Sequence, residues 1–219
     1  AMLENHEGSI FAVKLALNDI NLAVNEMFKN LNSYQYTRII YVGAGTSARI
    51  GVQDGTELYP TFGWPKDRVD YIIAGGKSAL TQPIENAEDD VLKAKKMFKK
   101  LKIIDKDVLI GLSASGITPF TLAVINEANN VNALTIGIGN NKGTKLQKIA
   151  NVGITLQTGY EILAGSTRLK AGTAQKICLN LISTLCMSKL GRIKNGMMSH
   201  LVTTNKKLRI RKKYITQII

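Results

Sequence analysis

The chain has 219 residues, of which 45% are hydrophobic and 21% are charged. These values are typical of a soluble globular domain and exclude an intrinsically disordered chain. No apolar stretch is long enough to span a bilayer, and the N-terminus is polar. We therefore expect a cytoplasmic protein without a membrane partner.

The formal net charge of +13 raises the question of a nucleic acid partner. Basic residues concentrate in 93–102 and 206–213, where Phe98 is the only aromatic residue. Phe98 also falls at core spacing with Met97 and Leu101. We therefore expect solvated basic faces, a general attraction for small anions, and no nucleic acid partner.

The two cysteines, Cys178 and Cys186, lie eight positions apart within one helical pattern. This placement favours small core residues of a reducing compartment over a disulfide or a metal site. We expect no metal.

The first element in the chain is a helix over residues 9–31, which we assign to an N-terminal segment, 1–36. Apolar residues recur there at helical spacing and form one stripe: Ile10, Val13, Ala16, Leu17, Ile20, Val24, Met27, Phe28 and Leu31. Such a stripe fits a helix that packs on the core or one that packs on a second copy of the chain, and the pattern leaves both open.

Five apolar runs then alternate with helical patterns and define a core over 37–191. The predicted strands are 38–43, 69–74, 108–112, 133–138 and 152–156. The helices between and after them are 46–58, one ending near 101, 119–129, 143–150 and 167–190. Because the strand runs are continuously apolar, they predict an α/β fold with a five-stranded parallel sheet buried on both faces. Ser166 or Thr167 should cap the last helix, Gly191 should end it, and residues 192–219 read as a basic helical tail, with a weak pattern over 197–214.

Two short, hydroxyl-rich loops follow predicted strands, at 43–47 and 113–118. In parallel sheets ligands bind at the carboxyl ends of the strands, where free N–H groups of a starting helix attract anions. Neither loop has the Gly-Lys-Ser/Thr ending of a nucleotide-binding loop, and Ala48 stands where a dinucleotide fingerprint has its third glycine. Together the loops predict a cradle for a phosphate monoester, although each taken singly could be only a tight turn.

Three carboxylates lie near these loops in sequence. Glu57 is on the helix that begins at the first loop, Glu88 is at the start of the helix after the second strand, and Glu161 precedes the last helix. Two carboxylates around a phosphosugar can act as acid and base. The alternative for each is a solvated carboxylate or one favoured by a helix dipole.

At these residues the sequence resembles the bacterial N-acetylmuramic acid 6-phosphate etherases. The matching motifs are Ala44-Gly45-Thr46-Ser47-x-Arg49-x-Gly51, Asp54-x-x-Glu57, Pro60-Thr61-Phe62-Gly63, Ala87-Glu88-Asp89, Ala114-Ser115-Gly116-x-Thr118-Pro119 and the run 165–176. The resemblance covers about 37 to 208 and implies the sugar isomerase (SIS) fold, a three-layer α/β/α sandwich. Family members usually have more residues at both ends, so the chain resembles a shortened member.

The resemblance implies a lyase that splits the D-lactyl ether at C3 of N-acetylmuramic acid 6-phosphate, giving D-lactate and N-acetylglucosamine 6-phosphate. Opening of the sugar ring leaves an aldehyde at C1, which acidifies the C2 proton. By resemblance Glu88 removes that proton, while Glu57 protonates the departing lactate and then activates the water that adds at C3. No metal or other cofactor is implied.

The resemblance also implies binding residues and a homodimer. The phosphate and sugar would be held by Gly45, Thr46, Ser47, Ser113, Ser115, Gly116, Thr118, Glu161 and Lys170. Three other readings remain: a phosphosugar-binding protein without catalysis, a shortened and inactive etherase, and a SIS sugar-phosphate isomerase.

Overall fold

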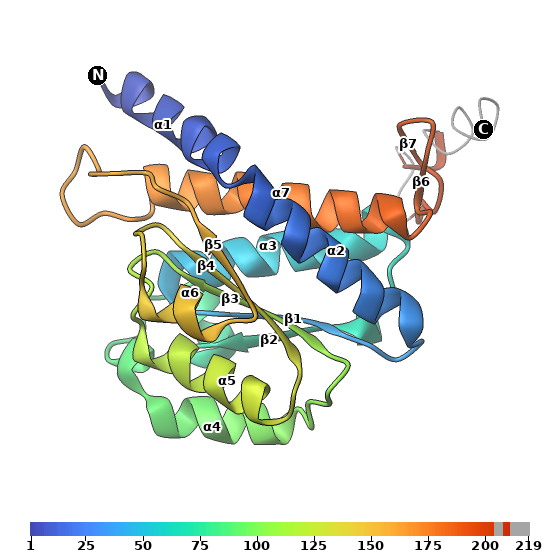
Figure 1. Ribbon diagram of the computed structural model, residues 1–219, viewed down its shortest axis with the longest axis horizontal. Coiled ribbons are helices and arrows are strands. Elements are labelled where there is room, and N and C mark those ends of the chain that lie inside the picture. Colours follow the sequence, from blue (N-terminus) through green and yellow to red (C-terminus); the bar gives the residue numbers. More distant parts are fainter. Residues whose placement is uncertain (204–207, 211–219) are drawn as a thin grey trace.

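A five-stranded parallel sheet forms the middle layer of the structure, with the strand order β2-β1-β3-β4-β5 (Figure 1). The computed structural model describes residues 1–203 and 208–210. The strands are β1 (Ile39–Gly43), β2 (Val69–Ile73), β3 (Val108–Ser113), β4 (Leu134–Gly139) and β5 (Val152–Thr155). The predicted parallel sheet is confirmed, and each predicted strand ends within one residue of the observed one.

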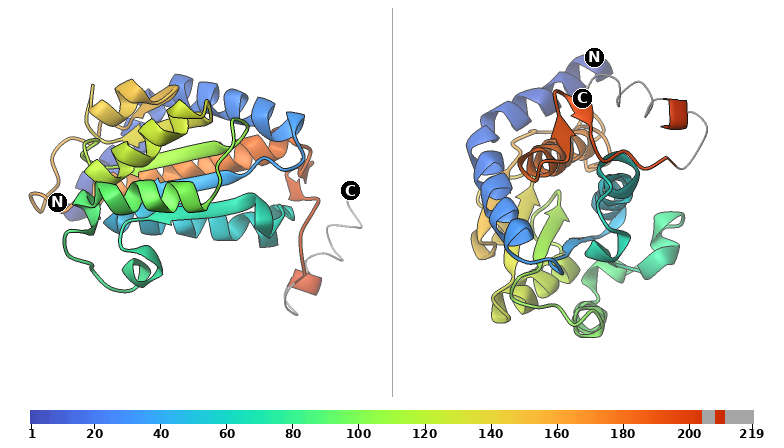
Figure 2. Two further views of the ribbon diagram at one scale, coloured as in Figure 1. Left: turned by 90° about the horizontal axis from the view of Figure 1, so that it is seen from below. Right: turned by 90° about the vertical axis from the view of Figure 1, so that its right-hand side faces the viewer.

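Helices cover both faces of this sheet, which confirms the three-layer α/β/α architecture. One face carries α1 (Met2–Leu15), α2 (Leu17–Ser33), α3 (Gly45–Phe62) and α7 (Lys170–Lys189). The other carries α4 (Val91–Lys100), α5 (Pro119–Asn130) and α6 (Lys145–Ile149). The right-hand view of Figure 2 shows α7 lying between α2 and α3 on the same side of the sheet.

Alternate residues of each strand supply the two halves of the core. Ile39 and Tyr41 of β1 belong to the cluster that packs under α2, α3 and α7. Ile40 and Val42 belong to the opposite cluster, under α4 and α5. Because both faces of the strand are buried, both sets must be apolar, and this produces the continuous apolar runs seen in the sequence.

The predicted single N-terminal helix is wrong, because two helices, α1 and α2, meet at Ala16. Ala16 is buried and its backbone leaves helical geometry, with φ −92° and ψ 6°. The change of direction lets both segments pack on α7. It also breaks the expected stripe, so Ile10 and Leu17 face outward with more than half of each side chain exposed.

After α7 the chain forms a small hairpin, β6 (Ile193–Lys194) and β7 (Met197–Met198), where a helical tail was expected. The hairpin turns at Asn195 and Gly196, which both have positive φ. Such an Asn-Gly turn matches the twist of paired strands. The helical prediction is therefore wrong for 197–203. Residues 208–210 are helical, and 204–207 and 211–214 lie outside the described residues.

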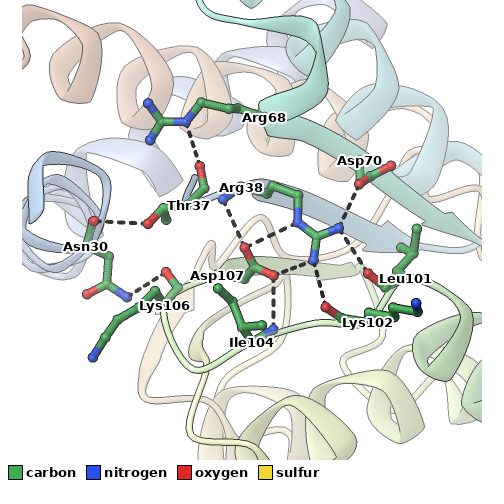
Figure 3. A network of polar contacts seen from close by, with 10 residues as sticks. All are labelled: Asn30, Thr37, Arg38, Arg68, Asp70, Leu101, Lys102, Ile104, Lys106 and Asp107. Atoms are coloured by element: carbon green, nitrogen blue, oxygen red, sulfur yellow. Dashed lines mark hydrogen bonds and ion pairs between the residues drawn. The ribbon is translucent and has the colours of Figure 1, made fainter. Parts of the chain in front are cut away.

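The amino ends of the central strands are joined by Arg38 and Asp107 (Figure 3). The Arg38 guanidinium donates to the Asp107 carboxylate at 2.6 Å and to Asp70 at 3.2 Å. Asp107 is fully buried and also accepts from the backbone N–H groups of Arg38 and Ile104. The network ties the starts of β1, β2 and β3 together at the edge opposite the loops described below.

Both cysteines are free and buried in the core-facing side of α7, as predicted. Burial raises the pKa of Cys186 to about 12 and that of Cys178 further, so both thiols stay protonated at neutral pH. Among the helices of the described residues, none is long and apolar enough to cross a membrane.

Candidate phosphosugar site

The loop after β1 leads directly into α3. The helix begins at Gly45, which has a φ of 53°, and its N-cap is Ala44, whose side chain caps nothing. The helix therefore starts one residue before the predicted Thr46. The first N–H groups of a helix have no partner within it, so those of Gly45, Thr46 and Ser47 point out of the helix start. Within the described residues, the hydroxyls of Thr46 and Ser47 make no hydrogen bond.

The loop after β3 brings three hydroxyls together. Ser113 Oγ lies 2.8 Å from Thr118 Oγ1 and 3.3 Å from Ser115 Oγ. Ser113 is buried and also accepts from the N–H of Gly116 at 3.0 Å, while Ser115 is exposed. Ser113 thus lies beneath the loop and orients the other two hydroxyls.

Gly116 allows this loop to fold tightly. Its φ is 69°, and a side chain there would collide with Thr144. The carbonyl of Gly116 accepts from the N–H of Leu146 at 3.0 Å, which fixes the loop to the start of α6. Only glycine meets both the backbone and the space requirement.

The two loops emerge side by side at the switch point of the sheet. Gly43, the last residue of β1, is in register with Leu112 of the neighbouring strand β3. The chain continues from β1 to β2 on one side and returns to β3 on the other. This reversal of strand order is where ligands bind in open α/β sheets.

The start of α7 lies next to the first loop, and it is capped by a side chain nine residues earlier in the sequence. Glu161 accepts from the backbone N–H groups of Lys170 at 3.0 Å and Ala171 at 2.8 Å. The predicted caps, Ser166 and Thr167, are therefore wrong: the N-cap is Leu169, and the Glu161 carboxylate meets the free N–H groups. At the other end the C-cap is Leu190, one residue before the predicted Gly191, which follows it with a φ of 73°.

Lys170 lies inside this junction and is buried. Its ammonium donates to the carbonyl of Tyr160 at 2.7 Å, and its own carbonyl accepts from Ser9 at 3.0 Å. A Cβ on Gly172 would lie 3.5 Å from the Thr46 methyl, which shows how closely α7 approaches the first loop. Glu161 and Lys170 therefore lie beside the site, where their hydrogen bonds fix the loop before α7 to the start of that helix.

Glu88 lies next to the first loop. A cavity of about 340 Å³ is lined by Gly45 and Thr46 of this loop, by Arg49 and by Glu88. Glu88 is exposed and sits in a short 3-10 turn, Ala87–Asp89, before α4, rather than at the start of that helix as predicted. The cap of α4 is Asp90, which accepts from the N–H of Lys93 at 2.9 Å.

Glu57 lies in a different cavity from Glu88. It lines a smaller cavity of about 110 Å³ between α3 and α7, together with Asp54, Lys176 and Asn180. Glu57 follows Gly45 by twelve residues (57 − 45) on α3, which is about 18 Å along the helix axis at about 1.5 Å per residue. One chain does not bring Glu57 and Glu88 into one cavity.

Comparison with known proteins identifies the family. Residues 19–129 match the glucokinase regulatory protein N-terminal SIS domain, and residues 90–184 match the SIS domain. The N-acetylmuramic acid 6-phosphate etherase of Deinococcus radiodurans is 42% identical over 99% of this chain and 70% of its own length. The etherase of Pasteurella multocida is 42% identical over 94% of this chain and 67% of its own length.

The chain belongs to the N-acetylmuramic acid 6-phosphate etherase family. It spans about two thirds of the length of these relatives. Solved structures agree on the fold. The C-terminal domain of glucosamine-fructose-6-phosphate aminotransferase from Francisella tularensis has a TM-score of 0.62 at 16% identity and covers 99% of this chain and 52% of that one. Phosphoheptose isomerase from Neisseria gonorrhoeae has a TM-score of 0.58 at 17% identity and covers 86% of this chain and 94% of that one.

In this etherase-family chain two side chains of α3, Arg49 and Asp54, stand in the matching motifs but received no predicted role. Arg49 lies one helical turn after Gly45, so it shares the cavity of Glu88. Asp54 is buried and joins α3 to α7 and β1. The spacing from Gly45 to Arg49 was a usable signal, because residues four apart lie on one helix face.

Proposed function

We propose that this chain is an etherase that cleaves the D-lactyl ether of N-acetylmuramic acid 6-phosphate, giving N-acetylglucosamine 6-phosphate and D-lactate. The observation that carries the proposal is the pair of hydroxyl loops at the switch point, which adjoins the cavity that Glu88 lines. Donors suited to a phosphate thus lie beside a carboxylate suited to proton removal. Family membership supplies the substrate.

The phosphate binds to the hydroxyls of Ser47, Ser115 and Thr118 and to the first N–H groups of α3. Negative charge is favoured there because the helix dipole is positive at its N-terminus. Ser113 supports the cradle from below through its hydrogen bond to Thr118. Glu161 and Lys170 keep the start of α7 against the first loop.

Elimination then proceeds in the open-chain sugar. Glu88 takes the proton from C2, the C3–oxygen bond breaks, and the lactate oxygen receives a proton from Glu57. Water adds to C3 of the resulting unsaturated sugar, and the proton returns to C2. The sum is one water consumed and one D-lactate released, with no change in oxidation state.

Glu57 reaches this sugar only from a second chain. In the phosphosugar, C3 and the phosphate are only a few bonds apart, whereas the cradle and Glu57 of one chain are separated by about 18 Å of helix. We infer a homodimer in which the partner subunit's Glu57 completes the site. Exposed apolar side chains support an interface on α1 and the start of α2: Met2, Leu3, Ile10, Phe11, Leu15, Leu17 and Leu22.

The chain's free, buried cysteines fit a reducing compartment, and we infer that it works in the cytoplasm.

The test is incubation with N-acetylmuramic acid 6-phosphate and measurement of both products. D-lactate and N-acetylglucosamine 6-phosphate should form in equal amounts, and Glu88→Gln should abolish both. Asp89→Asn is the matched control, since Asp89 is an exposed carboxylate next to Glu88 that does not line the cavity. Binding of N-acetylglucosamine 6-phosphate without lactate release would overturn the etherase proposal and support a non-catalytic phosphosugar-binding protein.

A further inference from the structure

Arg49 is a half-buried cation in the cavity that holds Glu88. It lies in the second turn of α3, four residues after Gly45. Its Nε donates to the backbone carbonyls of Ala79 at 3.1 Å and Leu80 at 3.2 Å. These bonds hold the guanidinium against the short 3-10 segment Gly76–Leu80 and leave its other edge for the cavity.

The Arg49 guanidinium lacks a counter-ion within the described residues. No carboxylate forms an ion pair with it there, and its two Nη atoms donate to no acceptor. Arg38 is the contrast, since its guanidinium is paired with Asp107 and Asp70. A half-buried cation is stabilised by an anionic partner. We therefore expect a bound ligand to supply the anionic group that pairs with Arg49.

The charges lining the cavity narrow the choice of ligand. Arg49 is the only Lys or Arg among its described lining residues, and Glu85 and Glu88 are the only carboxylates. A guanidinium presents a planar fork of donors that matches a carboxylate with two parallel hydrogen bonds. The cavity volume of about 340 Å³ is that of a small-molecule site.

The substrate carries two anionic groups, and only one is accounted for by the hydroxyl loops. The second is the lactyl carboxylate, which is attached to the carbon next to the ether oxygen. That oxygen is on C3, beside the C2 position where Glu88 acts. A sugar placed with C2 at Glu88 therefore carries its lactyl carboxylate into the same cavity, where Arg49 is the cation.

We propose that Arg49 binds the lactyl carboxylate and so distinguishes the ether substrate from phosphosugars that lack this group. This assignment rests on the proposed function and adds a specificity-determining residue to it. Binding the carboxylate also fixes the ether oxygen relative to C2. After cleavage the carboxylate leaves with D-lactate, so N-acetylglucosamine 6-phosphate no longer contacts Arg49.

The test compares two ligands that differ only in this charge. The first is N-acetylmuramic acid 6-phosphate reduced at C1 to the open-chain alcohol, which cannot eliminate because its C2 proton is not acidified. The second is the same compound with the lactyl carboxylate converted to a carboxamide. Dissociation constants are measured by calorimetry for the wild-type protein, Arg49→Gln, Arg49→Lys and Lys77→Gln.

The wild-type protein should prefer the carboxylate by about 10- to 100-fold, the usual range for a charged, bidentate hydrogen bond. Arg49→Gln should bind both ligands about equally, with carboxamide affinity changed less than about threefold, and Arg49→Lys should keep part of the preference. Lys77→Gln removes an exposed cation of the adjoining 3-10 segment, and this variant should keep the full preference for the carboxylate ligand.

A purely structural Arg49 would give a different pattern. Arg49→Gln would then weaken both ligands equally, and this result overturns the proposal, as does a wild-type protein without preference for the carboxylate. If Arg49→Gln does not fold, the preference for the carboxylate ligand over the carboxamide ligand is compared between the wild-type protein and Arg49→Lys, and this comparison tests the proposal. Lactate release is assayed separately, so a charge preference without turnover would refute the lyase proposal and leave the ligand assignment standing.

Discussion

The Asp54 carboxylate accepts a hydrogen bond from the Tyr41 hydroxyl at 2.8 Å, deep under the helix layer. Its other oxygen accepts from Asn180 at 2.9 Å and Ser183 at 3.1 Å. One buried carboxylate therefore joins β1, α3 and α7, the elements whose ends form the candidate site. The junction holds the middle of α3 against the middle of α7.

Removing this carboxylate should destabilise the fold strongly. Asp54→Ala leaves three donors without an acceptor, and we expect a loss of about 3 kcal/mol in the free energy of unfolding. Tyr41→Phe removes one donor and should cost about 1 kcal/mol. Urea denaturation measures both, and an Asp54→Ala variant as stable as the wild-type protein would show that the junction contributes nothing.

Stability should fall at high pH in part through Tyr71. Burial, with the charges of Asp54 and Asp70 adding to it, raises the pKa of Tyr71 to about 12 from its ordinary 10. Between about pH 10 and pH 12 the folded protein keeps the Tyr71 proton that the unfolded chain has lost. The contribution of Tyr71 to the free energy of unfolding is therefore complete below about pH 10 and disappears as pH rises to about 12. Tyr71→Phe should flatten the decline of the urea midpoint in that window, while exposed Tyr36→Phe should not. Parallel curves for Tyr71→Phe and the wild-type protein would contradict the assignment.

Gly116→Ala should damage the second loop, and Gly143→Ala provides a matched control. Both glycines have nearly the same φ, 69° and 70°, but a Cβ collides with Thr144 only at Gly116 and meets open space at Gly143. Gly143→Ala should lose about 1 kcal/mol through backbone strain alone. Gly116→Ala should lose about 2 kcal/mol more and bind N-acetylglucosamine 6-phosphate measurably less tightly in calorimetry. Equal losses for the two variants would refute the packing argument.

Glu161→Gln should weaken the start of α7. The carboxylate accepts two backbone N–H groups at the positive end of the helix, and an amide side chain offers one neutral acceptor. We expect a loss of about 1–2 kcal/mol in the free energy of unfolding, together with weaker phosphosugar binding. Glu7→Gln, an exposed position on α1, serves as the charge control. An unchanged melting temperature for Glu161→Gln would remove the capping role.

The sequence predicted those features that short-range physics determines. Continuous apolar runs such as Ile39 to Val42 gave the strands, because strands buried on both faces need no polar alternation. Hydroxyls and glycine directly after two strands gave the loops at 43–47 and 113–118. That these two loops lie side by side could not be predicted, because it depends on the strand order and hence on how the whole chain packs.

The features that sequence reasoning missed depend on distant contacts. The break at Ala16 follows from packing on α7, and Glu161 caps a helix nine residues further along because the loop between them folds back. The placement of Glu57 and Glu88 in two different cavities could not be predicted from their spacing in the chain. By contrast, the Asn195-Gly196 hairpin had a local signal, which a weak helical pattern obscured.

The most direct test of the shared site is complementation between two inactive variants. Glu57→Gln and Glu88→Gln are each purified alone and also produced together, so that mixed dimers form, and D-lactate release is measured in all three preparations. If the partner subunit's Glu57 works with Glu88 at one sugar, each variant alone is inactive and the mixture regains about a quarter of the wild-type activity, because half of the dimers carry one intact site. A mixture as inactive as its components, or full activity in either variant alone, would contradict the account.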